Sequence, residues 1–283
     1  MSLGVGGLAS PRVAVVTGAN KGIGFHIAKQ LVGSGRFGAV VLGCRNPSLG
    51  EAAAETLGRE RPGGNNATAV RSLQCDISDP RSVARFAKDV ESAYGRVDVL
   101  VNNAGVAFKN ADPTPFKEQC GPTLRTNFYG TLDCTRALLP LLRLGEDPRC
   151  VNVASMAGRL GQVSPALQAR AAADNLTVED AVNFMREFED SVAEGTHREK
   201  GFGQSNYGMS KLGVQMLTRA FARAEAGRVK FFSCCPGYCD TDMSSHKGPR
   251  PPEEGAKNAV MPALDEGVLP NGCYIADLGI AQW

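Results

Sequence analysis

Short apolar runs alternate with stretches of helical periodicity along almost the whole chain. The runs predict strands at residues 13–17, 40–43, 70–75, 97–101, 150–154 and 229–234, with a short last strand at 273–276. The stretches between them predict helices at residues 23–33, 52–60, 80–94, 122–144 and 206–225. Because the apolar runs lack polar alternation, they are typical of a parallel sheet covered by helices on both faces. The pattern predicts an α/β fold with a doubly wound, mostly parallel sheet.

One segment interrupts this alternation. Residues 164–205 follow a predicted strand, where a doubly wound fold normally returns to a helix after a short loop. Thr177 and Asp180 form a capping-box pattern, apolar positions recur at helical spacing through 181–192, and Gly195 supplies a helix end. The segment is therefore predicted to be a helical insert, with a functional or interface role, packed on a single domain that comprises residues 1–283.

Composition narrows the range of partners. The 283 residues are 43% hydrophobic and 21% charged with a net charge of +2, which favours neither a nucleic-acid groove nor an anionic membrane surface. No apolar run approaches the roughly 20 residues of a membrane span, and the first residues lack the pattern of a secretory signal. We therefore expect a cytoplasmic protein without nucleic-acid or membrane partners.

The cysteines and histidines show no pattern of a structural or metal site. The nine cysteines are odd in number, none form a CxxC pair, and several lie inside apolar runs, where a free thiol behaves as a small hydrophobe. None of the three histidines has a partner pattern for metal binding or nucleophilic catalysis. The sequence predicts reduced thiols and no metal.

A glycine-rich turn follows the first predicted strand. Gly18, Gly22 and Gly24 leave room for a tight turn, for a pyrophosphate close to the backbone and for close packing of the next helix. The N-terminus of that helix would face the phosphates with free N–H groups. The strand before the turn and the helix after it are the context that a Rossmann-type dinucleotide site requires, so we prefer this interpretation to a plain strand–helix connection.

The kind of dinucleotide follows from the end of the second strand. An NAD site usually carries an acidic residue there to hold the ribose 2′-hydroxyl. This chain has Arg45 instead, and Lys21 adds a second cation inside the glycine turn. Both would pair with a 2′-phosphate, so the sequence predicts NADPH or NADP+ as cofactor. The alternative is that both side chains are solvated surface charges.

Tyr207 and Lys211 lie one turn apart on the same face of a predicted helix. An ammonium beside a phenol favours the phenolate, so we expect Lys211 to lower the pKa of Tyr207 and make it a usable acid near neutral pH. This spacing also occurs on ordinary exposed helix faces, so the pair gains its meaning from the other motifs.

Taken together, the motifs resemble the short-chain dehydrogenase/reductase family. They are TGANKGIG at 17–24, NNAG at 102–105, Ser155 after the fifth strand, YGMSK at 207–211, and Pro236-Gly237 with Thr241 after the sixth strand. They occur in the family's order and span nearly the whole chain. The insert, the CPGYCDTDM segment at 235–243 and the closing Gln282-Trp283 resemble more narrowly the cytosolic NADPH-dependent carbonyl reductases.

This resemblance implies a role for each matching residue. Tyr207 would protonate the carbonyl oxygen as hydride arrives, Ser155 would donate a hydrogen bond to that oxygen, and Lys211 would hold the nicotinamide ribose. Asn127 matches the family's fourth catalytic position, which supports a water-linked proton relay to the lysine. Further cofactor contacts would come from Asn20, Ile23, Asp76, Ile77, Asn103, Ala104, Gly105, Pro236, Gly237 and Thr241. The alternative is a purely structural role for these residues: Asn103 and Asn127 would form hydrogen bonds with buried backbone groups, and Ser155 would cap a helix.

The substrate is expected outside the carboxyl ends of the strands, between the loops at 106–115, 156–164 and 238–246. Its predicted contacts are Ser155, Met156, Tyr207 and Tyr238. Apolar and aromatic surface there suits a quinone, an aromatic ketone or another hydrophobic carbonyl compound. The insert resembles a segment that covers a surface used for tetramer formation elsewhere in the family, so we expect a monomer.

Other functions also fit parts of the sequence. The fold could carry a non-catalytic NADP(H) sensor or scaffold, although such a protein has no need of Ser155, Tyr207 and Lys211. A methyltransferase also uses a glycine-rich first turn, but Arg45 and the Tyr207–Lys211 pair disfavour it. Within the enzyme class, the reaction could run as alcohol oxidation on steroid- or prostaglandin-like lipids.

Overall fold

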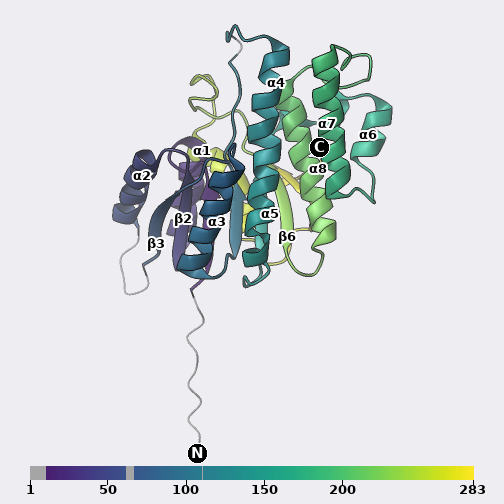
Figure 1. The fold of residues 1–283 in the computed structure, drawn as a ribbon. Coiled ribbons are helices and arrows are strands. Elements are labelled where there is room, and N and C mark those ends of the chain that lie inside the picture. The colour runs from purple at the N-terminus through teal and green to yellow at the C-terminus, as the bar shows by residue number, and fades with distance from the viewer. Residues whose placement is uncertain (1–10, 62–66, 110) are drawn as a thin grey trace, which may run out of the picture.

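The computed structural model describes residues 11–61, 67–109 and 111–283. One sheet runs through the molecule in the order β3-β2-β1-β4-β5-β6-β7-β8, with helices on both of its faces (Figure 1). The strands are β1 (Val13–Thr17), β2 (Ala39–Cys44), β3 (Ala69–Gln74), β4 (Val99–Asn102), β5 (Arg149–Val153), β6 (Lys230–Cys235), β7 (Tyr274–Ala276) and β8 (Gly279–Ala281). The helices are α1 (Gly22–Gly33), α2 (Pro47–Glu60), α3 (Pro80–Tyr94), α4 (Phe116–Leu124), α5 (Gly130–Leu142), α6 (Pro165–Ala171), α7 (Val178–Glu194), α8 (Asn206–Ala224) and α9 (Pro252–Ala263). The predicted doubly wound, mostly parallel α/β sheet is confirmed.

The strand order places a crevice at the middle of the sheet. All neighbouring strands pair in parallel except β7 and β8, which are antiparallel. The chain runs outward from β1 through β2 to β3 and then returns to β4 on the other side of β1. At such a reversal the connections leave in opposite directions and open a crevice outside the carboxyl ends of the strands.

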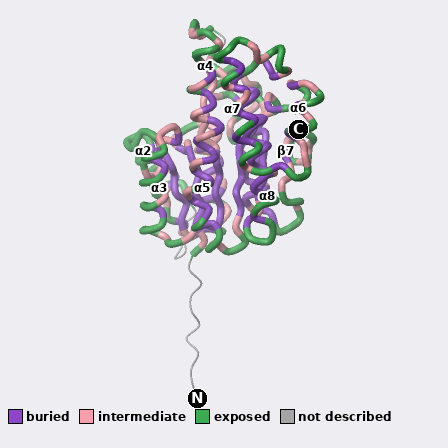
Figure 2. Tube along the Cα trace, turned by 45° about the vertical axis from the view of Figure 1, so that its right-hand side comes forward, coloured by how far each residue is buried: buried purple, intermediate pink, exposed green. Residues whose placement is uncertain are grey.

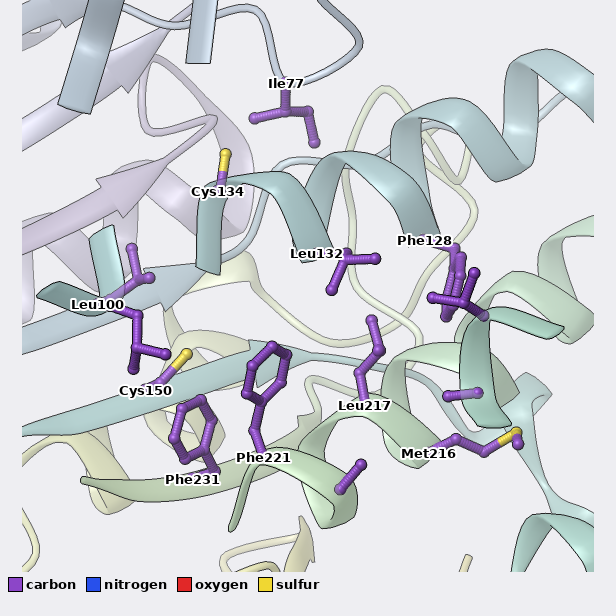
Figure 3. Close-up of a cluster of buried hydrophobic side chains, with 14 of the residues drawn as sticks. Ile77, Leu100, Phe128, Leu132, Cys134, Cys150, Met216, Leu217, Phe221 and Phe231 are labelled. Atoms are coloured by element: carbon purple, nitrogen blue, oxygen red, sulfur yellow. The ribbon is translucent and has the colours of Figure 1, made fainter. Parts of the chain in front are cut away.

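Two hydrophobic cores hold the helices against the sheet. Figure 3 shows part of the core on the α5 and α8 side, where Phe128, Leu132, Leu217, Phe221 and Phe231 converge. The rings of Phe221 and Phe231 stack with centroids 5.2 Å apart. The second core lies between the sheet and helices α1 and α9. Figure 2 shows the inner parts of α5 and α8 buried and the exposed residues gathered on outer turns and loops.

The edge strand β3 departs from the predicted continuous apolar pattern. Every residue of β1, β2, β4 and β5 is buried, whereas β3 mixes exposed positions, such as Arg71 and Gln74, with intermediate ones, such as Leu73. β3 has a neighbour on one side alone, so its flank meets solvent and accepts polar residues.

The insert forms α6 and α7. The predicted capping box is present: Thr177 Oγ1 accepts from the Asp180 N–H at 3.1 Å, and the Asp180 carboxylate accepts from the Thr177 N–H at 2.9 Å. Gly195 ends α7 in the left-handed conformation, φ 79°. α7 packs on α4 and α8, and these helices run side by side in Figures 1 and 2.

The predicted helix at 122–144 is wrong in its start and in its regularity. α4 begins earlier, at Phe116, and contains Pro122 in its interior. A π-helical segment, Arg125–Tyr129, then separates α4 from α5. The apolar pattern does not reveal this segment because its residues keep a buried face. α9 and β8 also went unpredicted: α9 begins after Pro251 and contains Gly255 and Pro262, which weaken its helical signal.

The C-terminal Trp283 joins three parts of the fold. The Arg219 guanidinium of α8 lies 5.3 Å from the centroid of the indole ring, and its Nη2 donates to the carbonyl oxygen of Ala172, next to α6, at 3.2 Å. Both side chains line a cavity of about 410 Å³ between α8 and the C-terminal strands. This cavity contains none of the predicted site residues.

Candidate active site

A cavity of about 460 Å³ opens at the carboxyl ends of β1 and β4, where the strand order reverses. Most of the predicted site residues line it: Gly18, Asn20, Lys21, Gly22, Ile23, Gly24, Arg45, Asp76, Ile77, Asn103, Ala104, Gly105, Tyr207, Lys211, Pro236 and Thr241. These residues come from six separate places in the sequence. The fold thus brings together the glycine turn, the two predicted cations and the Tyr207–Lys211 pair.

Five predicted residues lie outside the lining of this cavity: Gly237, Asn127, Ser155, Met156 and Tyr238. Gly237, with φ +82°, is covered by the Arg250 guanidinium, whose Nη1 would lie 2.4 Å from a Cβ at that position. Met156 and Tyr238 are more than half exposed, at 62% and 56%. They stand on the loops that leave β5 and β6, beside the cavity and not within it.

The glycine turn fits tightly against the end of β4. Gly18 and Gly22 have left-handed φ values of 65° and 57°. A Cβ on Gly24 would stand 2.3 Å from the Gly18 carbonyl oxygen and 2.4 Å from Asn103 Nδ2. Asn103 Nδ2 also donates to the carbonyl oxygens of Thr17 and Gly18, at 3.0 and 3.2 Å. Asn103 therefore has the structural role that the sequence left open, and it fixes the turn's shape.

The features that a dinucleotide needs are present around this turn. No side chain caps the N-terminus of α1, so its first N–H groups face the cavity without a side-chain acceptor. Arg45 is exposed at the end of β2, and no acidic residue stands beside it in sequence. The Asp76 carboxylate accepts from the Ser78 N–H at 2.9 Å, which holds the 76–78 loop at the cavity wall. The residues present fit a phosphorylated dinucleotide.

Lys211 is buried, with 5% exposure, and its ammonium is committed to the backbone. Its Nζ donates to the Val153 carbonyl oxygen at 2.7 Å and lies 5.7 Å from the centroid of the Tyr207 ring. Burial removes water from the ammonium and lowers the pKa of Lys211 to about 8.

The expected low pKa of Tyr207 is wrong for the protein without ligands. Burial raises the pKa of Tyr207 to about 12, because the phenolate loses more hydration than the phenol, and a hydrogen bond with Ser155 offsets part of this. Lys211 lies over the ring and donates to Val153, which leaves its charge poorly placed to stabilise the phenolate oxygen.

Asn127 lies in the π-helical segment and holds the loop after β4 in place by hydrogen bonds. Its Oδ1 accepts from the Val106 N–H at 2.8 Å, and its Nδ2 donates to the Val106 carbonyl oxygen at 2.9 Å and to Ser210 Oγ at 3.0 Å. Gly105 lies between it and Lys211: a Cβ there would be 3.1 Å from Asn127 Oδ1 and 3.6 Å from Lys211 Nζ. Irregular π-helical turns often occur at functional sites.

Ser155 also has a structural role. Its Oγ accepts from the Ala157 N–H at 3.1 Å and so caps the short 3-10 turn Met156–Gly158. The next backbone N–H, that of Met156, donates to Cys235 Sγ at 3.3 Å, as does the N–H of Gly237. The sulfur of Cys235 thereby ties the loop after β5 to the loop after β6.

The acidic part of the cavity was not predicted from the sequence. Asp240, Asp242 and His246 line it, although the loop at 238–246 was expected to face the substrate. Asp242 forms an ion pair with Lys21. The family pattern places an acid only at the end of the second strand, and sequence spacing gives no signal for a partner 221 residues away.

Within residues 11–61, 67–109 and 111–283, no three His, Cys, Asp or Glu side chains are grouped so as to hold a metal ion, and no helix is long and apolar enough to cross a membrane. All nine cysteines fall in the described part of the chain, where each is a free thiol and all but Cys273 are buried.

Comparison with known proteins agrees with this geometry. The family model for short chain dehydrogenases matches residues 12–172 and 191–251, so the chain belongs to that family. Two similar curated proteins are carbonyl reductase [NADPH] 1 of Sus scrofa, 38% identical over 97% of this chain and 95% of that protein, and carbonyl reductase [NADPH] 3 of Rattus norvegicus, 40% identical over 96% and 98%. Among solved structures, salutaridine reductase from Papaver somniferum superposes with a TM-score of 0.82 and 30% identity, covering 94% of this chain and 99% of that one. Menthone neomenthol reductase from Mentha piperita gives 0.78 and 29%, over 95% and 99%.

The contact at Gly24 gives a direct test of the turn. Gly24→Ala forces a methyl group against the Gly18 backbone, so we expect a loss of about 1–3 kcal/mol in the free energy of unfolding and loss of dinucleotide binding. Gly33→Ala is the matched control on the same helix, since a Cβ there meets nothing within 4 Å. It should be neutral or stabilise by up to about 1 kcal/mol. Urea unfolding of both variants checks this, and equal effects would refute the packing argument.

Proposed function

We propose that this protein is an NADPH-dependent carbonyl reductase, which reduces a hydrophobic ketone, aldehyde or quinone. One observation carries the proposal: Tyr207 and Lys211 line the same cavity as the glycine turn and Arg45. A proton donor and a nucleotide site in one cavity suit hydride transfer, and the names of the relatives as carbonyl reductase [NADPH] support it.

The cofactor would lie across the carboxyl ends of the strands. Its pyrophosphate fits the glycine turn, Arg45 and Lys21 would meet the 2′-phosphate, and Asp76 with Ile77 would border the adenine. Asn103, Ala104 and Gly105 would form the wall, and Pro236 and Thr241 would border the carboxamide end. When bound, NADPH supplies the hydride.

Side chains of the protein would supply the proton and stabilise the charge that develops on the carbonyl oxygen. With a pKa raised to about 12, Tyr207 keeps its proton throughout the neutral range and can donate it to a carbonyl oxygen. Ser155, whose hydroxyl lies near enough to Tyr207 to lower the pKa of its phenol, can donate to the same oxygen and stabilise its developing charge. Lys211 would hold the ribose, and Asn127 would keep the loop at Gly105 and Val106 in place.

Carbonyl reduction is preferred to the alternatives. The same Tyr207 that donates a proton in reduction would accept one in alcohol oxidation, so the preferred direction rests on the names of the relatives, which are carbonyl reductases. A sensor or scaffold would need neither group. For the substrate, the exposed Met156 and Tyr238 offer apolar and aromatic surface beside the site, which supports hydrophobic carbonyl compounds.

Replacing Tyr207 tests the proposed proton donor. Tyr207→Phe should lower NADPH-dependent turnover of quinones and aromatic ketones by about 10²–10⁴-fold while NADPH still binds, because the ring stays and the hydroxyl goes. Tyr94→Phe, at the end of α3 and outside the cavity, is the control. NADPH absorbance follows the reaction, with NADH for comparison. Full activity in Tyr207→Phe would contradict the assignment.

The depressed pKa of Lys211 predicts a pH dependence. The ammonium is charged below about pH 8 and loses its proton as the pH rises through that value, so kcat/KM for NADPH should fall there. Tyr207, with a pKa of about 12, stays protonated in this range. Lys211→Arg holds its charge to higher pH, so its basic limb should move upward. An unmoved limb would assign the fall to another group.

We further propose that the whole chain, 1–283, acts as one cytoplasmic, monomeric domain. α7 covers α4 and α8, which removes an apolar helix face from contact with another subunit. Light scattering at micromolar concentration should give a mass near 29.9 kDa, and a tetramer would contradict the proposal. Cell fractionation checks the compartment.

A further inference from the structure

The turn that follows Ser155 lies against the helix that carries Tyr207 and Lys211. This 3-10 turn, Met156–Gly158, packs on α8. A Cβ on Gly158 would stand only 2.7 Å from the Lys211 carbonyl carbon, so the two backbones are in close contact. The distance between the Ser155 hydroxyl and the Tyr207 phenol therefore depends on how the turn is held against α8.

Gln162 connects this turn with the helix. Its Nε2 donates to the Ala157 carbonyl oxygen at 2.9 Å and to the Gly208 carbonyl oxygen of α8 at 3.3 Å. It also donates to the Arg159 carbonyl oxygen at 3.1 Å, so the two hydrogens of the amide are shared among three acceptors. One side-chain amide thus links the loop after β5 to the start of α8.

Both linked positions adjoin a side chain with a proposed role in the reaction. Gly208 follows Tyr207 in the sequence, and the Ala157 N–H donates to Ser155 Oγ at 3.1 Å. Ala157 is therefore held through its carbonyl oxygen by Gln162 and through its N–H by Ser155. Against the larger effect of burial, which raises the pKa of Tyr207, the nearby Ser155 hydroxyl lowers it. A shift of Ala157 would move this hydroxyl relative to the phenol.

The Gln162 side chain is confined between two glycines. A Cβ on Gly208 would lie 2.7 Å from Gln162 Oε1, and a Cβ on Gly203 would lie 2.9 Å from the same oxygen. A side chain at either position would push the amide group away from its acceptors, because atoms in a packed structure do not approach so closely. The chain therefore keeps space for this amide at the start of α8 and in the segment before it.

A second glutamine holds the same turn from α8. Gln215 is buried, with 2% exposure, and its Nε2 donates to the Gly158 carbonyl oxygen at 3.1 Å. Since Gln162 binds the carbonyl oxygen of Ala157, two successive carbonyl groups of the turn are each held by a side-chain amide. Gln162 is the better residue to replace, because it is only partly buried and Gln215 lies in the core.

We propose that Gln162 is a positioning residue that holds the Ser155 hydroxyl at the correct distance from Tyr207 for both to reach the substrate oxygen. The inference rests on the proposed function, which gives Ser155 and Tyr207 their roles. Gln162 does not line the cofactor cavity, so it acts through the turn after Ser155 and not on the dinucleotide. Its replacement should therefore lower kcat for a carbonyl compound and leave the dissociation constant of NADPH unchanged.

Removal of the amide tests this role. Gln162→Met keeps the length of the side chain and removes both hydrogens, so kcat for a quinone should fall about three- to tenfold, the range expected for loss of one or two neutral hydrogen bonds. Gln168→Met is the matched control, since Gln168 is also partly buried and donates its Nε2 to the Val163 carbonyl oxygen at 2.8 Å, outside the Ser155 turn. It should change neither kcat nor NADPH binding. Equal falls in both variants, or none in Gln162→Met, would overturn the proposal.

A double-mutant cycle separates positioning from a general structural effect. In the Ser155→Ala background there is no hydroxyl for Gln162 to position, so adding Gln162→Met should lower kcat there by less than about twofold. The same fall in both backgrounds would show that Gln162 acts independently of Ser155, and the proposal would be wrong.

Amide hydrogen exchange gives a readout that needs no turnover. Because the Ala157 N–H donates to Ser155 Oγ, its exchange in the ligand-free protein should be faster in Gln162→Met than in the wild type and unchanged in Gln168→Met. Unchanged exchange at Ala157 in Gln162→Met would overturn the proposal. If the wild type reduces no carbonyl compound with NADPH, the proposed function fails, and exchange at Ala157 still decides whether Gln162 positions Ser155.

Discussion

The close approach of the glycine turn to the end of β4 is the constraint on which the site depends. Gly18, Gly24 and the Asn103 amide are packed so tightly that no additional carbon fits between them. This contact sets where α1 begins and therefore where its free N–H groups point. It also fixes the loop after β4, against which Asn127 and Lys211 are placed. The tight packing of the turn after β1 thus helps to position Asn127 and Lys211, which lie a hundred or more residues later in the sequence.

Burial shapes the chemistry of the site in two opposite ways. Burial makes Lys211 easier to deprotonate and makes the partly buried Tyr207 harder to deprotonate. Both shifts favour the neutral forms, as expected where no compensating charge is in contact. Tyr207 is consequently kept as a proton donor. The cost of burying Lys211 is reduced by its hydrogen bond to Val153, which also anchors α8 to the end of β5.

Most of the fold and of the nucleotide site could be predicted from local patterns. Apolar runs located the strands to within about two residues, and Thr177 with Gly195 marked the ends of α7, because capping is decided by neighbours in sequence. The predictions failed where tertiary contacts decide. The π-helical turn at Asn127 and the edge position of β3 leave no periodic signal. The direction of the Tyr207 pKa shift depends on burial. The ion pair between Lys21 and Asp242 joins residues that are far apart in the sequence. The roles of the site residues stay predictions.

Trp283 is the only tryptophan in the sequence, and it lies against Arg219, far along α8 from Tyr207 and Lys211. A single indole under a guanidinium gives the molecule an intrinsic optical label at one known place. Its emission will report the environment of the C-terminal strands and of the neighbouring insert without contributions from other indoles. Unfolding followed at 350 nm would accordingly describe the detachment of this corner, whereas far-ultraviolet dichroism averages over every helix.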